Sequence, residues 1–90
     1  MSAQAMVKQD GGQDSVRRVL ALVDAMLARK QRPAAAPDGD LREAGLSSLD
    51  TVNLMLAVEG EFDLFLPQDE MTPENFRSAE AIARLVERVA

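Results

Sequence analysis

The chain contains no cysteine, histidine, tryptophan or tyrosine, and its only aromatic residues are three phenylalanines. The lack of cysteine excludes a disulfide, a thiolate nucleophile and a zinc–thiolate site. The lack of histidine excludes a Ser–His pair, an imidazole base and a mixed histidine–carboxylate metal centre. We therefore expect no catalytic residue and no metal site in this chain.

A basic surface, a signal sequence and a membrane span are also lacking. The formal net charge is −5, from 15 acidic and 10 basic residues, which argues against binding to nucleic-acid phosphates. No apolar run is longer than the five residues of 54–58, which are too few to cross a bilayer. Residues 1–14 have no apolar stretch of the kind that directs secretion. We expect a monomeric cytoplasmic protein that binds no nucleic acid and has no membrane span.

What remains is a small aliphatic protein. With 90 residues, of which 47% are hydrophobic and 3% aromatic, the chain can form one domain whose core favours helices. We expect a flexible N-terminal tail at 1–14 and a folded domain at 15–90. The first helix should begin near Ser15, with Asp14 or Ser15 as its N-cap. Its apolar positions have helical spacing: Val16, Val19, Leu20, Val23, Met26 and Leu27.

The rest of the chain predicts two further long helices and one short one. Residues 31–40 contain two prolines and a glycine and should form a long loop. A short helix or turn is expected within 68–75. The last helix should begin after Ser78, with an inward face of Ala79, Ile82, Leu85, Val86 and Val89. The predicted fold is an all-α bundle of three main helices and one short helix, with the long loop between the first two main helices.

The second long helix begins with a capping signal. Ser47 is a good N-cap and Asp50 stands at the third helical position, as in a short capping box. Ser48 is then the first helical residue, and the helix should end near Glu61 or Phe62. Apolar residues cover more than half of its circumference. They form either a wide core stripe or a surface that contacts a partner or lines a ligand pocket, with Leu49, Val52 and Leu56 beside Asp50 and Asn53.

Negative charge is concentrated in the middle of the chain. Residues 43–75 include eight acids and no base: Glu43, Asp50, Glu59, Glu61, Asp63, Asp69, Glu70 and Glu74. Such a run is either an ordinary solvated face or a surface without local counter-charges that attracts a basic partner.

Residues 40–54, DLREAGLSSLDTVNL, resemble the attachment motif of acyl carrier proteins. In that family a glycine two residues upstream leads into Asp-Ser-Leu, followed by an acid, a valine and a leucine. The similarity continues through 59–63, 66–67 and 76–78, and it covers 16–89. It implies the four-helix acyl-carrier fold.

The resemblance also implies a function. Ser48 would be modified with 4'-phosphopantetheine, taken from coenzyme A by a separate phosphopantetheinyl transferase. The group would carry an acyl or aminoacyl cargo as a thioester and present it to partner enzymes, so the chain itself would not be an enzyme. A phosphodiester at a helix N-terminus is favoured by the helix dipole. In the alternative interpretation, Ser47 and Ser48 only cap the helix.

Three positions depart from the family pattern. Ser47 replaces the acid that usually precedes the modified serine, and Asn53 and Gly60 replace further acids. This makes the helix less acidic than in the carriers of fatty-acid synthesis. The sequence looks more like small stand-alone bacterial carriers, some of which accept an amino acid from a ligase. The predicted partner surface comprises Leu49, Val52 and Leu56 as apolar contacts, together with Asp50, Asn53, Glu59 and Glu61.

Two other functions are alternatives to this one, and one of them is excluded by the sequence. The chain could be a helical interaction module that is never modified. A small hydrolase that uses Ser48 as its nucleophile is excluded, because the chain offers no histidine base.

Overall fold

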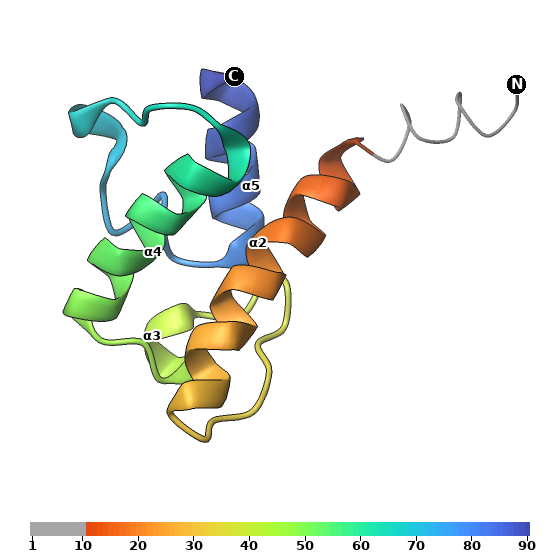
Figure 1. The fold of residues 1–90 in the computed structure, drawn as a ribbon, viewed down its shortest axis with the longest axis vertical. Coiled ribbons are helices and arrows are strands. Elements are labelled where there is room, and N and C mark those ends of the chain that lie inside the picture. The colour runs from red at the N-terminus through yellow and green to blue at the C-terminus, as the bar shows by residue number, and fades with distance from the viewer. Residues whose placement is uncertain (1–10) are drawn as a thin grey trace, which may run out of the picture.

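The computed structural model describes residues 11–90, which form an all-helical bundle without strands in that part of the chain (Figure 1). The elements are α2 (Gly11–Arg29), α3 (Leu41–Ala44), α4 (Ser48–Phe62), the short 3₁₀ helix η1 (Gln68–Glu70) and α5 (Ala79–Val89). The predicted architecture of three main helices plus one short helix is confirmed, the short one being η1. Residues 1–10 of the predicted tail lie outside the described residues.

Helix α2 begins earlier than the sequence predicted. Its first residue is Gly11, so Asp14 and Ser15 lie inside the helix and neither is its N-cap. Adding a residue to an existing helix costs much less than starting one, so two glycines need not end it. Asp14 also stabilises the first turn, because its carboxylate lies near the positive end of the helix dipole and 3.7 Å from the guanidinium of Arg17.

The core is aliphatic, as predicted, and it lies where α2 packs against both α4 and α5. The inward face of α5 matches the prediction: Ala79, Ile82, Leu85 and Val86 are buried, and Val89 packs against them half-buried. On α2, every turn of the predicted stripe contributes a fully buried residue, at Val19, Val23 and Leu27. Within the described part of the chain, no helix is both long enough and apolar enough to cross a membrane.

The long loop between α2 and α3 is docked on the bundle. Asp24 of α2 accepts a hydrogen bond from the Ala35 backbone N–H at 3.0 Å. At the other end, the Glu80 backbone N–H donates to the Pro37 carbonyl at 3.0 Å. The loop therefore has an anchor on α2 and another on α5, so its path depends on both helices.

A short helix that the sequence did not predict follows this loop. Asp40 caps α3 by accepting hydrogen bonds from the backbone N–H groups of Arg42 and Glu43. The chain then turns at Gly45, whose φ of 128° disfavours any residue with a side chain. A Cβ there would also stand 2.6 Å from Nε of Arg32. This turn leads the chain directly into α4.

Two leucines of α4 provide a test of this arrangement. Leu54 is fully buried, whereas Leu56 is 60% exposed. We expect Leu54→Ala to lower the free energy of unfolding by about 2–5 kcal/mol, because it leaves a cavity in the core. Leu56→Ala should change it by no more than about 0.5 kcal/mol. Urea unfolding followed by circular dichroism measures both, and equal losses would contradict the assigned core.

Candidate functional site

The start of α4 is held by a complete capping box, as the sequence predicted. The Ser47 hydroxyl oxygen accepts a hydrogen bond from the Asp50 backbone N–H at 3.1 Å. In return, the Asp50 carboxylate accepts one from the Ser47 backbone N–H at 2.8 Å. Ser48 is the first helical residue. The two neighbouring serines therefore have different environments, and only Ser47 is used as a cap.

The Ser48 side chain is exposed. Within residues 11–90 its hydroxyl has no hydrogen-bond partner, so the oxygen is open to an approaching reagent. A hydroxyl sealed under packed side chains could not accept a bulky group. The structure therefore fits a covalent modification at Ser48.

The Asp50 carboxylate also pairs with a cationic side chain that directly follows the C-terminal end of α2. Lys30, just after α2, donates hydrogen bonds to the Asp50 carboxylate and, at 2.9 Å, to the Gly45 carbonyl. The Lys30 hydrogen bond, followed by that from the Ser47 backbone N–H, lowers the pKa of Asp50 from 3.8 to about 2. The carboxylate beside Ser48 is therefore ionised at neutral pH, but its charge is already paired.

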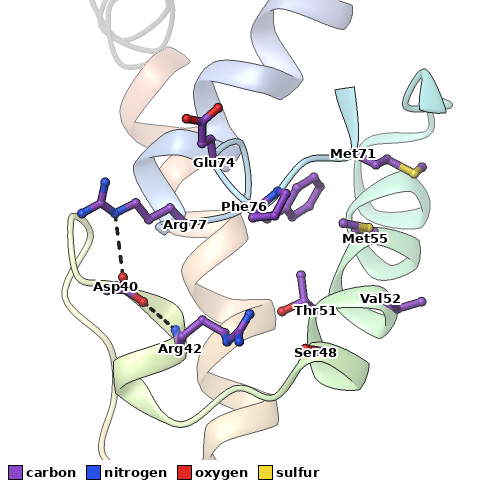
Figure 2. Close-up of a pocket in the computed structure, with 11 residues that line it drawn as sticks. Asp40, Arg42, Ser48, Thr51, Val52, Met55, Met71, Glu74, Phe76 and Arg77 are labelled. Atoms are coloured by element: carbon purple, nitrogen blue, oxygen red, sulfur yellow. Dashed lines mark hydrogen bonds and ion pairs between the residues drawn. The ribbon is translucent and has the colours of Figure 1, made fainter. Parts of the chain in front are cut away.

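A pocket of about 400 Å³ lies on one side of Ser48 (Figure 2). Its walls come from the first turns of α4 and from the segment between η1 and α5. The lining residues are Asp40, Arg42, Ser48, Thr51, Val52, Met55, Met71, Pro73, Glu74, Phe76 and Arg77. The apolar members form the walls, while Asp40, Arg42 and Arg77 lie together on the side of α3 (Figure 2). The pocket can hold a flexible, partly apolar chain that starts from Ser48.

The three apolar residues predicted at the partner surface are exposed. Leu49 is 69%, Val52 51% and Leu56 60% exposed. Their spacing of three and four residues places them in one stripe along α4 that begins next to Ser48. Asn53 is exposed as well and lines a second groove, of about 280 Å³, between α4 and the end of α2. An exposed apolar stripe of this kind is typical of a protein contact.

One exposed aromatic residue was missed by the sequence analysis. Phe65 is 88% exposed in the link after α4. Its neighbours Leu64 and Leu66 are half-buried and buried. Alternation of this kind is the usual pattern of an extended segment with one face on the core, and it could have identified Phe65 as the outward residue.

The charge of the middle segment differs from the prediction. Three of its eight acids have counter-charges from outside the segment: Lys30 binds Asp50, Arg18 binds Glu61 at 2.8 Å and Arg88 binds Glu70 at 3.1 Å. Glu59 accepts a hydrogen bond from the Leu66 backbone N–H at 2.8 Å. The alternative of a surface without local counter-charges is therefore wrong for these three acids, whereas Glu43, Asp63, Asp69 and Glu74 make no ion pair within residues 11–90. Asp50, Glu59 and Glu61 each have a role in the fold, and their role in partner binding stays a prediction.

The chain is similar to one protein family and to several known carrier proteins. Residues 16–86 match the family described as "Phosphopantetheine attachment site". Two curated proteins of Bradyrhizobium diazoefficiens are similar to the chain. Aminoacyl carrier protein 1 is 46% identical over 81% of this chain and 82% of its own length. Aminoacyl carrier protein 2 is 50% identical over 77% and 79%.

A solved structure is similar as well. It is the crystal structure of Bradyrhizobium japonicum glycine:[carrier protein] ligase complexed with cognate carrier protein and an analogue of glycyl adenylate. The matching chain has 45% sequence identity and a TM-score of 0.66, over 81% of this chain and 96% of that chain. A second structure, of the same ligase complexed with glycylated carrier protein, matches with 46% identity and a TM-score of 0.61, over 78% and 96%.

The paired charge of Asp50 predicts a pH dependence of stability. Because the pKa of Asp50 in the folded chain is below its ordinary value, the ionised carboxylate stabilises the fold at neutral pH. That stabilisation is lost as the pH falls from about 4 to about 2. We expect Asp50→Asn to be less stable than the wild type at pH 7, and the difference to close over this range.

Urea midpoints of Asp50→Asn and the wild type, measured at several pH values, check this predicted difference in stability. Asp69→Asn is the control, because Asp69 makes no ion pair within the described residues, and its midpoint should stay close to that of the wild type at pH 7. A difference between Asp50→Asn and the wild type that is the same at pH 2 and pH 7 would contradict the assigned role of Asp50.

Proposed function

Because this chain belongs to the phosphopantetheine-binding carrier proteins, we propose that Ser48 is the residue that carries the group and that the cargo is an amino acid, with glycine as the first candidate. The family is one of carriers, not of catalysts, so the chain supplies position and recognition. Family membership also disfavours the alternative of a helical module that is never modified.

The observation that carries the proposal is the contrast between Ser47 and Ser48. The Ser47 hydroxyl is engaged in the cap, whereas the Ser48 hydroxyl is exposed and has no partner within residues 11–90. The Ser48 hydroxyl would lose its proton, and its oxygen would attack the pantetheine-bearing phosphate of coenzyme A. The pyrophosphate bond would break, adenosine 3',5'-bisphosphate would leave, and the Ser48 oxygen would become the ester oxygen of a phosphodiester. When bound, the group supplies a terminal thiol that holds the cargo as a thioester. No side-chain thiol competes for the cargo, because the chain contains no cysteine.

The choice of an amino acid as cargo is supported by the relatives. Two curated relatives are named aminoacyl carrier proteins, and both similar structures contain a glycine:[carrier protein] ligase. In one of these structures the carrier is glycylated. At 45–46% identity over about four fifths of this chain, a similar loading enzyme is the simplest partner. A phosphopantetheinyl transferase and the enzymes that use the cargo are further proposed partners.

We assign the apolar stripe of Leu49, Val52 and Leu56 to the contact with the loading ligase. The stripe begins beside Ser48, so an enzyme that covers it also reaches the point from which the cargo is presented. A few residues near the centre of an interface carry most of its binding energy, and covering the apolar area of the stripe contributes favourably to binding. The carboxylates of Glu43 and Glu74 make no ion pair within residues 11–90 and can attract a basic surface on the partner.

The attachment site is tested by two single substitutions. After incubation with coenzyme A, magnesium and a broad-specificity phosphopantetheinyl transferase, we expect the intact mass of the wild type to rise by one phosphopantetheinyl group. Ser48→Ala should show no increase. Ser47→Ala should still be modified, although the loss of its cap costs about 1 kcal/mol of stability. Modification of Ser48→Ala, or its loss only in Ser47→Ala, would overturn the assignment.

The ligase contact is tested with a matched pair of exposed apolar residues. Leu56→Asp places a charge within the stripe, whereas Phe65→Asp places one after the end of α4. With the modified proteins as substrates of the Bradyrhizobium glycine:carrier protein ligase, we expect Leu56→Asp to raise KM about 10-fold or more. Phe65→Asp should leave KM within about 2-fold of the wild type. Equal effects of the two changes would show that the stripe is not the contact.

A further inference from the structure

The arginine of the short helix α3 has no partner in the fold. Arg42 is exposed, and its guanidinium makes no hydrogen bond or ion pair within residues 11–90. Its side chain lines the same pocket as Ser48. Figure 2 shows this side chain extending from α3 toward the first turns of α4, where Ser48 and Thr51 lie.

Two of the acids near Arg42, Asp40 and Asp50, are already occupied, and the other two, Glu43 and Glu74, make no ion pair with it within residues 11–90. One oxygen of Asp40 accepts hydrogen bonds from the backbone N–H groups of Arg42 and Glu43, at 2.8 and 3.2 Å. The other oxygen of Asp40 lies 3.8 Å from Nε of Arg77. Asp50, two residues after Ser48, is paired with Lys30. Arg42 is therefore a cation beside the attachment residue with no anion assigned to it.

We propose that Arg42 binds the phosphodiester that joins the phosphopantetheine group to Ser48. This inference rests on the proposed function, since it requires Ser48 to be the modified residue. A phosphodiester has one negative charge and two free oxygens, and the planar guanidinium donates to such a pair of oxygens in a fork. Before modification the Ser48 hydroxyl is uncharged and offers Arg42 no ionic partner. Within residues 11–90, Arg42 would therefore gain such a partner only when the phosphodiester is attached.

The local charges favour this pairing. The residue before Ser48 is the uncharged Ser47, and the charge of Asp50 is bound by Lys30. Neither residue competes for Arg42 or repels the phosphate strongly. Because Arg42 lies on the pocket side of Ser48 (Figure 2), the contact would hold the phosphate on that side. Arg42 is in this sense a positioning residue.

The direct test compares the unmodified and the modified wild type by NMR. With ¹⁵N-labelled protein, we expect the Nε–Hε signal of Arg42 to shift on modification, and the shift to shrink at high salt because the pair is exposed. Arg84 is the internal control: it is exposed on α5 and forms no ion pair within the described residues. Its signal should not move. The Arg42 signal is assigned by its absence in Arg42→Gln.

Melting temperatures give a second measurement. At low salt we expect modification to raise the melting temperature of the wild type and of Arg84→Gln by about 1–5 °C, the range for one exposed ion pair in a domain of this size. Arg42→Gln should show no rise. Its unmodified form should melt as the wild type does, because the Arg42 side chain has no hydrogen bond or ion pair to lose within residues 11–90.

Two results would overturn the inference: an Arg42 signal that does not respond to modification, or an Arg42→Gln variant with the same rise in melting temperature as Arg84→Gln. The intact mass is measured first in every sample. A wild type that gains no phosphopantetheinyl group would refute the proposed function itself, and it is thereby distinguished from a failure of the Arg42 contact.

Discussion

The carboxylate of Asp50 is the junction on which the site depends. It accepts hydrogen bonds from the Ser47 backbone and from Lys30, a residue 20 positions earlier in the sequence. The first contact fixes the start of α4, and the second ties that start to the end of α2. Lys30 also binds the Gly45 carbonyl, so the turn before α4 is held by the same pair. Ser48 is thereby presented from a rigid point, although its own side chain makes no hydrogen bond within the described residues.

Different residues of helix α4 pack in the core, line the pocket and remain exposed. Leu54 and Val58 are buried against the bundle. Val52 and Met55 line the pocket beside Ser48, and Leu49 and Leu56 remain exposed on the stripe. This explains why the helix is apolar around more than half of its circumference while only two of its residues are buried. The alternative of a merely wide core stripe does not hold for the exposed leucines.

The features that sequence reasoning predicted correctly are local ones. The capping box, the place of Ser48 and the buried face of α5 depend on residues within a few positions of each other. Two of the features that it missed, the counter-charges of the middle acids and helix α3, depend on distant contacts. The counter-charge of Glu61 lies on α2, that of Asp50 on the residue after α2, and that of Glu70 on α5. Each is far from its acid in the sequence. Helix α3 has only four residues and relies on Asp40 and a hydrogen bond from Leu41 to the Arg77 carbonyl. Its propensity alone would not predict it.

The docked loop between α2 and α3 has a consequence for how the protein is degraded. Because residues 31–40 are anchored on Asp24 and on the backbone of Glu80, we expect a protease to cleave this loop slowly while both anchors are closed. Cleavage there should become faster when the loop's anchors on α2 and α5 open. The rate of nicking in this loop would then report the opening of the bundle and not the fraying of a free surface segment. Binding of any partner that stabilises the bundle should lengthen the lifetime of the chain through the same segment.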